Sequence, residues 1–402
     1  MPAERLLRRT IWFYFGFQFF FGLLFWLPVF YEYQKRMGLS DAEIFRIQSL
    51  YYVAFCLLEI PTGMIADQMG RRRCMRAGAA VLVGSNLLPI FWPTYAGFLT
   101  HFLLIALARS FISGASSAYL YDLLDRHDAS DDFKLVEGRA RAYSLYGKVA
   151  CWSAIGLLMS WHVTLPYWLT VGAALLAVGF SLALPPVETG QVGKLDAASV
   201  WRQLREVAGW FRLEPFLGVV ILQGVAAFVL ARLVQVNLFQ PVLEQRGFPV
   251  AGYGLVMALM TACEAVGSAR PAWVRGWLDD FRAVFVLSLL LAASMGALAP
   301  SGFWMTLALL SFFAYLTGLL YPIQRQLIND VIPDSRHRAT IMSLESIVDR
   351  AVNAWLAALI GGYLAGGRLD EYLLVSAAWT VAFLLVLWAA SGLRVFRRRT
   401  AA

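Results

Sequence analysis

The segment that says most about the fold reads Glu59-Ile60-Pro61-Thr62-Gly63-Met64-Ile65-Ala66-Asp67-Gln68-Met69-Gly70-Arg71-Arg72-Arg73. Long apolar stretches lie on both sides of it, at 44–66 and 74–92. Gly63 would let a neighbouring helix approach closely, and Gly70 suits a tight turn. Asp67 can cap a helix start or pair with a cation, and the arginines would hold the turn on the cytoplasmic side of a membrane. We therefore expect two membrane-spanning helices joined by a short inner turn.

The composition extends this expectation to the whole chain. Of its 402 residues 59% are apolar and 15% are charged, whereas soluble domains are about half apolar and a quarter charged. A spanning helix needs about 20 mostly apolar residues, and the unbroken runs do not alternate as porin strands do. A soluble enzyme, a disordered protein and a porin-like barrel are excluded. Twelve spans are predicted, at 11–31, 44–66, 74–92, 97–123, 142–161, 165–184, 216–238, 252–272, 283–298, 303–328, 339–364 and 371–393.

The charges indicate topology rather than a nucleic-acid partner. The net charge is +8, with 34 Lys and Arg against 26 Asp and Glu. With the N-terminus inside, 25 of the 34 cations lie on the inner side and five on the outer side, which places both termini in the cytoplasm. The first span has no small-residue cleavage site after it, so we expect it to be retained. The four cysteines show no paired spacing, and neither a metal site nor a cofactor is expected.

One polar segment divides the twelve spans into two sets of six. We predict an N-terminal six-helix half at 1–184, a cytoplasmic linker at 185–211 and a C-terminal six-helix half at 212–402. Apolar residues recur at helical spacing within the linker, which predicts an amphipathic helix on the inner membrane surface and favours a tether over a regulatory element. These residues are Val200, Leu204, Val207 and Phe211.

The two halves carry weak internal repeats, as in carriers built from two halves of parallel topology. A shift of 205 residues places Gln18 on Gln223 and Glu59 on Glu264. A shift of 197 residues places Arg139-Ala140-Arg141-Ala142 on Arg336-His337-Arg338-Ala339, and Lys148 on Glu345. Four matches in corresponding spans favour a pseudo-symmetric pair of six-helix halves.

The inner turn resembles the G-x-x-x-D-x-x-G-R-[KR] signature of the major facilitator superfamily. The residues that match this conformational motif are Gly63, Asp67, Gly70, Arg71 and Arg72. The stretches 113–122 and 333–340 resemble a bacterial multidrug or metabolite efflux-like branch. The corresponding turn of the second half, 276–282, is degenerate, and the fifth span lacks the Gly-Pro signature typical of drug–proton antiporters.

The resemblance implies the twelve-helix fold of that superfamily, in a bacterial-type inner membrane. It implies a secondary carrier of a small molecule that works by alternating access, for which a monomer suffices. The chain has no nucleophile, metalloprotease or ATP-binding motif, so we expect no enzyme activity and a transport step driven by a gradient.

Polar residues within the spans are the candidates for substrate binding and coupling, because an ionisable side chain costs about 2.5 to 3.5 kcal/mol in the bilayer centre. Glu345 and Asp349 lie one turn apart on one helix face. They either pass a proton or bind a cation, or they neutralise neighbouring charges. The full set is Gln18, Glu59, Arg109, Gln223, Glu345, Asp349 and Arg350.

Two further charged residues are candidates for a latch between the halves. In the arrangement of the superfamily the fifth span faces the eighth, so Lys148 would meet Glu264. Such a pair would be strong when dry and weak when hydrated. The alternative is that each residue satisfies neighbours within its own half.

The function expected from these features is export of a small amphipathic molecule in exchange for protons. The aromatic residues of the first span would suit a bulky ligand, although they would equally suit contact with lipid. Two alternatives stay open, which are proton-coupled or facilitated uptake of a polar nutrient and lipid flipping. A receptor without transport activity is a further class.

Overall fold

The computed structural model describes residues 2–187, 215–332 and 338–399, and these ranges contain helices and connecting turns but no β-strand. Within them, nine helices are long and apolar enough to cross a membrane. These nine coincide with nine of the twelve predicted spans, which confirms an all-helical membrane protein. The other three predicted spans fall on α3, on α7 with α8, and on α17, so the full count of twelve stays a prediction.

The chain divides into two compact units, Met1–Asp196 with Pro249–Ala258, and Ala197–Phe248 with Leu259–Ala402. The predicted boundaries of the two halves and the linker remain a prediction. From residue 188 to residue 211 the linker, including its predicted amphipathic helix, lies outside the described residues.

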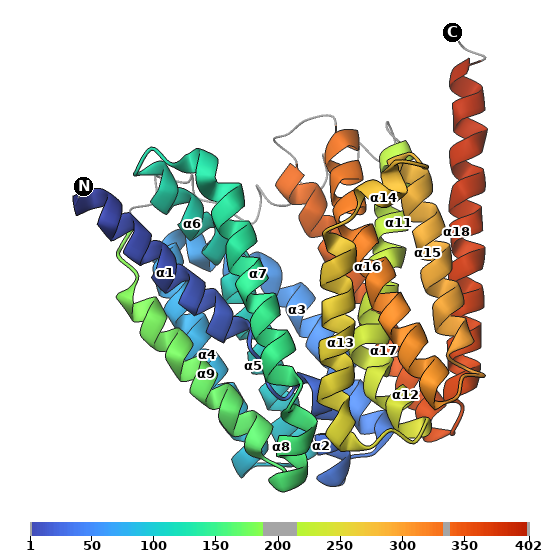
Figure 1. Cartoon of the computed structure of the whole chain (residues 1–402), viewed down its shortest axis with the longest axis horizontal. Helices are drawn as coiled ribbons and strands as arrows, with labels where there is room; N and C mark the ends of the chain where they lie inside the picture. The colour runs from blue at the N-terminus through green and yellow to red at the C-terminus, as the bar shows by residue number, and fades with distance from the viewer. Residues whose placement is uncertain (1, 188–214, 333–337, 400–402) are drawn as a thin grey trace. The chain divides into compact units, whose positions relative to one another are not determined.

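The first unit contains the helices from α1 to α9 (Figure 1). Their bounds are α1 Pro2–Gly22, η1 Leu27–Val29, α2 Phe30–Arg36, α3 Asp41–Met69, α4 Arg71–Phe91, α5 Tyr95–Ser113, α6 Ala115–Asp125, η2 Ser130–Asp132, α7 Phe133–Trp152, α8 Ile155–Trp161 and α9 Leu165–Ala183. Three predicted spans are broken rather than continuous, at 23–26, at Gly114 and at 153–154. The first break precedes Pro28, and the second lies at a glycine, a residue that weakens a helix interior.

Aromatic rings packed into glycine positions hold α1 against its neighbours in this unit. A Cβ on Gly16 would lie 2.5 Å from the ring of Phe180 on α9. On the α7 side the ring of Phe19 occupies the space beside Gly147, where a Cβ would be closer still. The helices therefore approach more closely than larger residues would allow.

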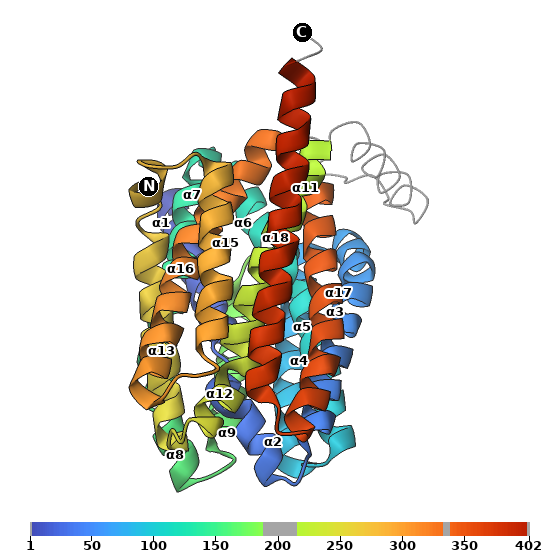
Figure 2. The ribbon, with the colours of Figure 1, turned by 90° about the vertical axis from the view of Figure 1, so that its right-hand side faces the viewer.

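The second unit contains the helices from α11 to α18, apart from the first turns of α13 (Figure 2). Their bounds are α11 Pro215–Arg232, η3 Leu233–Leu238, α12 Phe239–Gln245, α13 Val250–Ser268, α14 Ala272–Arg275, α15 Asp280–Ala297, α16 Phe303–Val331, α17 Arg338–Ala365 and α18 Leu369–Arg399. The η3 stretch is π-helical and joins α11 to α12. It widens the helix in the middle of what the sequence predicts as one span, and such widenings are frequent at functional sites.

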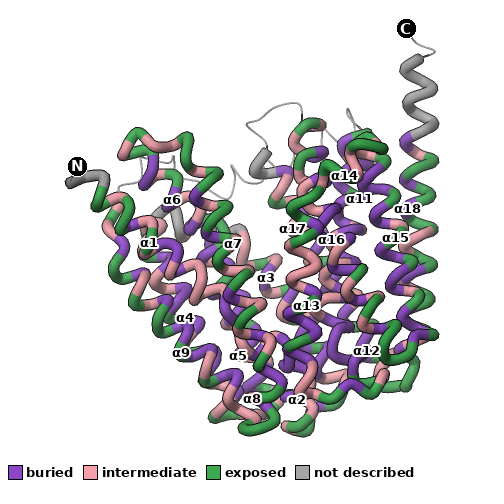
Figure 3. The backbone as a smooth tube through the Cα atoms, viewed as in Figure 1, coloured by how far each residue is buried: buried purple, intermediate pink, exposed green. Residues whose placement is uncertain are grey.

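Burial follows the packing of each unit (Figure 3). Buried residues line the helix sides that face neighbours, and α18 keeps much of its outer face exposed.

Between α13 and α16 the backbones come close at Gly318, where a Cβ would lie 2.9 Å from the carbonyl carbon of Glu264. At the far end of α12, Arg246 binds Asp370 and donates to the carbonyl oxygen of Leu298 at 2.9 Å, which joins the ends of α12, α15 and α18.

Candidate functional site

The most buried carboxylates that the structure describes are two residues on α17. Glu345 is 1% exposed and Asp349 is 4% exposed. They lie one turn apart, as predicted, and each is paired with an arginine from another helix. Glu345 Oε2 lies 2.7 Å from Arg325 Nη1 on α16, and Asp349 Oδ2 lies 2.8 Å from Arg232 Nη2 on α11. Both carboxylates therefore neutralise a cation within the second unit.

Arg325 was not among the residues that the sequence indicated. It comes six residues before the end of α16, at Val331. The structure places its guanidinium over two rings, 4.8 Å from the centroid of Phe228 and 5.4 Å from that of Tyr321. The two rings and Glu345 stabilise the positive charge of Arg325, and the side chain remains partly exposed. Its place three residues after Pro322 within a span was the available signal.

Asp349 accepts hydrogen bonds at both of its oxygens. Asn353, one turn further along α17, donates to Asp349 Oδ1 at 2.9 Å, while Arg232 occupies Oδ2. Arg232 is the last residue of α11, and the π-helical stretch starts directly after it. The Asp349 pair is therefore held at the point where the helix geometry changes.

A buried amide lies beside the Glu345 pair. Gln324 on α16 is fully buried and donates from Nε2 to the carbonyl oxygen of Val220 on α11 at 3.0 Å. Gly224, one turn along α11, has no side chain, and its missing Cβ would lie 2.7 Å from Glu345 Oε1 and nearer still to Gln324 Nε2. Three helices thus bring a carboxylate, a guanidinium and an amide together around one glycine.

The two predicted glutamines occupy different surroundings in their own units. Gln223 is buried and donates to the carbonyl oxygen of Phe281 at 3.2 Å. Gln18 is partly buried and donates to the hydroxyl of Tyr14 at 2.8 Å and to Ser116 Oγ at 3.4 Å. Their role as substrate contacts stays a prediction.

Gln18 belongs to a hydroxyl-rich network that joins α1, α6 and α7 of the first unit. Tyr14 donates to Glu137 Oε2 at 2.8 Å, and Ser117 donates to Glu137 Oε1 at 2.9 Å. Among the described residues no cation is paired with Glu137. Tyr14 and Glu137 were not predicted as site residues, because Glu137 precedes the predicted fifth span and Tyr14 is one of many aromatic residues in the first.

The remaining predicted charges lie on several helices. Arg109 on α5 is exposed and makes no hydrogen bond or ion pair within the part of the chain that the structure describes. Arg350 donates to Ser346 Oγ one turn earlier on α17, and Glu59 lies on α3. Lys148 Nζ lies 5.7 Å from the centroid of the Trp152 ring in its own unit, and Glu264 lies on α13. The predicted latch between the halves remains untested.

The inner turn of the first unit has the conformation that its sequence predicts. Gly70 separates α3 from α4 with a φ of +87°, a value that favours glycine. Arg71 binds Asp122 on α6 and donates to the carbonyl oxygen of Ala118 at 2.7 Å, and Arg72 donates to the carbonyl oxygen of Leu184 at 3.1 Å. These arginines tie the turn to α6 and to the end of α9. Gly63 and Asp67 lie on α3, and the surroundings of these two residues are outside what the structure describes.

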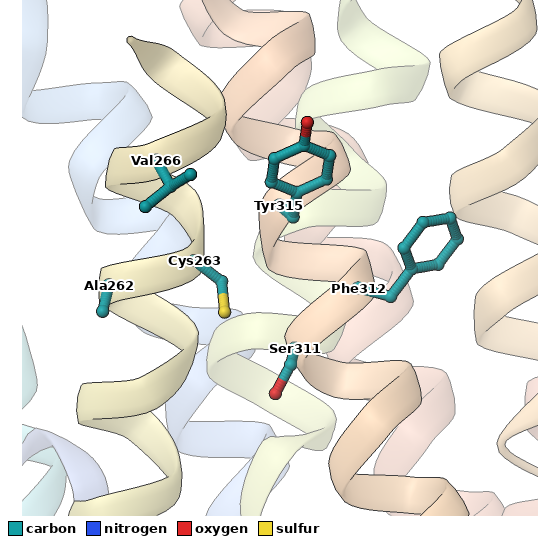
Figure 4. A pocket seen from close by; sticks show the side chains of 6 residues that line it. All are labelled: Ala262, Cys263, Val266, Ser311, Phe312 and Tyr315. Carbon is teal, nitrogen blue, oxygen red and sulfur yellow. The ribbon is translucent and has the colours of Figure 1, made fainter. Parts of the chain in front are cut away.

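A shallow groove of about 310 Å³ lies between α13 and α16 (Figure 4). Its lining is almost entirely apolar and consists of Ala262, Cys263, Val266, Ser311, Phe312 and Tyr315. It contains none of the predicted site residues. Among the described residues no three His, Cys, Asp or Glu side chains cluster in a way that could hold a metal ion.

Comparisons with known proteins agree on the fold. The sequence model of the Major Facilitator Superfamily matches residues 38–280, whereas no curated protein sequence matches the chain. The structure resembles that of the nucleoside transporter NupG with a TM-score of 0.74 at 12% identity, covering 95% of this chain and 98% of that one. A peptide transporter POT in complex with sulfate gives a TM-score of 0.73 at 15% identity, covering 95% and 94%. A POT family transporter in complex with 5-aminolevulinic acid gives 0.69 at 14% identity, covering 96% and 94%.

Proposed function

Because the chain belongs to the major facilitator superfamily and is a membrane transporter of that type, we propose that it exports a small, amphipathic organic molecule across the inner membrane in exchange for protons. The observation that carries proton coupling is the burial of Glu345 within a long helix of a membrane protein. A carboxylate in that environment is costly unless it is paired, and a buried carboxyl group that can exchange its proton is a natural coupling group. Export rests on the resemblance of the sequence to efflux carriers.

Arg325 and Arg109 are the proposed partners of the transported species. The Arg325 side chain is 28% exposed although Glu345 and two aromatic rings contact its guanidinium. Arg109 is exposed four residues before the end of α5, within the candidate span Tyr95–Asp125, where contact with lipid would be costly. Both would be accommodated by a water-filled path. Gln18, Gln223, Glu59, Asp349 and Arg350 remain proposed contacts or coupling residues.

A second function is favoured by the number of buried polar groups in the second unit, where Gln324, Asp349 and Asn353 are all buried. A path opened between these helices would be lined by polar groups, which suit a polar solute better than an apolar one. Proton-coupled uptake of a polar nutrient is therefore the alternative. The solved structures that resemble this one include nucleoside and peptide transporters, and their substrate classes provide the probes for the test.

The test uses the purified chain in liposomes that contain a pH-sensitive dye. Lipophilic cations, carboxylates, sugars, nucleosides and small peptides are added in turn. Export in exchange for protons predicts that substrate and protons cross in opposite directions, whereas uptake by symport predicts the same direction. Substrate movement without a pH change would leave a uniporter, and phospholipid movement without either would indicate a flippase.

Matched variants connect the measurement to the site. Glu345→Gln should abolish the substrate-dependent pH change while substrate exchange continues, and Arg109→Ala should weaken or abolish both. Glu371→Gln removes an exposed carboxylate at the start of α18 and should leave the pH change as in the wild type. Equal loss in Glu345→Gln and Glu371→Gln would refute a specific role for Glu345.

The proposed latch between Lys148 and Glu264 has its own experiment. Cysteines inserted on the fifth and eighth spans would be crosslinked in wild type and in Glu264→Gln. Faster or slower crosslinking in the variant supports an inter-half pair. An unchanged rate would show that both residues serve only their own halves.

A further inference from the structure

The two buried carboxylates of α17 differ in how their oxygens are satisfied. Both oxygens of Asp349 accept a hydrogen bond, one from Arg232 and one from Asn353. In Glu345 only Oε2 has a partner, which is Arg325. Oε1 is buried and has no hydrogen-bond partner among the described residues. Of the two, Glu345 is therefore the carboxylate with a vacant position for a proton.

A second buried acceptor belongs to Gln324, whose amide group lies with Glu345 Oε1 beside Gly224. Gln324 uses its Nε2 to donate to the carbonyl oxygen of Val220, but its Oε1 is buried and has no partner within the described part of the chain. A buried acceptor left unsatisfied costs about 1 to 3 kcal/mol, and here two such atoms occur in adjacent side chains. Two acceptors cannot satisfy each other, so a donor must be supplied.

Gly224 brings the two side chains together. Its missing Cβ would lie 2.7 Å from Glu345 Oε1 and closer still to the Gln324 amide, so any larger residue would collide with both. The amide and the carboxyl group therefore meet in the space that a side chain of α11 would otherwise fill. A proton added at this oxygen needs no additional volume.

From this geometry we propose that Gln324 is the positioning residue that holds the transported proton on Glu345. The proton comes from water and forms an O–H bond at Glu345 Oε1. The amide of Gln324 turns within the space beside Gly224, and its Oε1 accepts the hydrogen bond. One added proton thus satisfies both buried acceptors, while the hydrogen bond from Gln324 Nε2 to the carbonyl oxygen of Val220 is given up as the amide turns. The Glu345–Arg325 pair changes from neutral to a net charge of +1.

Glu345 is the proposed site of proton uptake among the charged groups that surround it. Arg325 faces it from α16, Asp349 follows it on α17, and Arg232 on α11 is bound to Asp349. Arg350, also on α17, bonds to Ser346. The charged residues of α18 are confined to its two ends. An amide is suited to this role because its oxygen can accept a hydrogen bond from a carboxylic acid.

This inference rests on the proposed proton coupling and is tested without any substrate. Infrared difference spectra of the full-length protein in lipid nanodiscs are recorded as the pH is lowered. A protonated carboxyl group gives a carbonyl band, and the band of Glu345 is the one that Glu345→Gln removes. In Gln324→Met, which keeps the side-chain length but lacks the acceptor oxygen, this band should move to higher wavenumber because its hydrogen bond is lost.

The matched control is Gln326→Met, which changes an exposed glutamine two residues along the same helix and should leave the band in place. Gly224→Ala should shift or abolish the band by filling the space that the amide needs. Gly362→Ala on α17 should not, because a Cβ there meets nothing within 4 Å. If the Gly224→Ala protein does not fold, the Gln324→Met protein decides, since it leaves Gly224 unchanged.

The outcomes separate this proposal from the proposed function. A Glu345 band at an unchanged position in Gln324→Met would overturn the role of Gln324 and leave proton coupling standing. A band that disappears when sodium replaces choline at constant pH would show an alkali-cation site instead of a proton site. No Glu345 band at any pH, together with no proton movement in liposomes, would refute both proposals.

Discussion

The two units satisfy their buried polar groups by different means. In the second unit, Glu345 and Asp349 are each neutralised by an arginine from another helix. In the first unit, Glu137 is held by hydroxyl groups of Tyr14 and Ser117, and no cation among the described residues is paired with it. A helical membrane protein can therefore accommodate a buried carboxylate either by charge neutralisation or by hydrogen bonding. Removing a partner should reduce the stability of the folded state by different amounts in the two cases.

The largest effect is expected from removing a cation in the second unit. Arg325→Met would leave Glu345 buried without its charge partner, which costs about 3 kcal/mol, at the lower end for a buried pair because Arg325 is partly exposed. Thermal unfolding in detergent, followed by tryptophan fluorescence, should show a large fall in Tm. The double variant Arg325→Met with Glu345→Gln should recover most of the loss. Failure to recover would mean that Arg325 stabilises the unit chiefly through Phe228 and Tyr321.

A smaller effect is expected in the first unit from Tyr14→Phe. This change removes the hydroxyl that donates to Glu137 and accepts from Gln18, without creating a cavity. Two hydrogen bonds are lost but no charge becomes unpaired, so we expect a cost of about 1 to 2 kcal/mol in the same unfolding experiment. A loss as large as that of Arg325→Met would erase the distinction between the two units.

The inner turns allow a second comparison between the units. Arg71 and Asp122 are mostly buried in the first unit, whereas Arg282 and Asp279 are well over half exposed at the turn before α15. Asp122→Asn should therefore cost about 1 kcal/mol, and Asp279→Asn close to nothing, since its amide oxygen can still cap the helix. Similar losses in both variants would indicate that the exposure of the ion pair does not determine its contribution.

The smallest effect concerns the start of α3. Ser40 and Glu43 form a reciprocal cap, in which Glu43 Oε2 accepts from the backbone N–H of Ser40 at 2.9 Å and from its hydroxyl at 2.7 Å. These bonds hold the pKa of Glu43 below its ordinary value. Because folding lowers the pKa of Glu43, its ionised carboxylate stabilises the folded state. This stabilisation is fully present above the pKa of the unfolded chain, about 4.3, and is lost as the pH falls through the lower pKa of the folded state.

The corresponding measurement is Tm as a function of pH for wild type and Glu43→Gln. The two curves should differ above about pH 5 and converge in more acidic solution. A constant difference between them down to the lowest pH would show that the Glu43 charge contributes nothing to the cap.

Much of the fold follows from the sequence because spans are determined by local composition. The apolar runs predict the helices, and the Gly70 turn is confirmed by its positive φ. The breaks at 23–26, Gly114 and 153–154 were not predicted, because a hydropathy pattern does not register where the backbone leaves helical geometry. The π-helical stretch at 233–238 was missed for the same reason.

The site was less predictable because contacts between helices are not encoded in spacing. The i, i+4 relation of Glu345 and Asp349 predicts that they share a face, but nothing in the sequence pairs them with Arg325 and Arg232. Gln324 and Gly224 are ordinary residues in their own helices. They become notable only where α11, α16 and α17 meet, and their roles remain to be tested.

The π-helical stretch Leu233–Leu238 also determines what the deletion of one residue would do to the fold. A π-turn closes with one residue more than an α-turn, so every side chain after it is rotated by about 100° relative to an uninterrupted α-helix. Asn237 and Gln240 are buried in this rotated frame. Deleting a single residue from the stretch would let α11 and α12 form one continuous α-helix in which the side chains of α12 keep their present faces. A one-residue deletion in the regular part of α11 would instead turn the side chains that precede it by about 100° relative to those that follow, although the composition of the chain would change equally little.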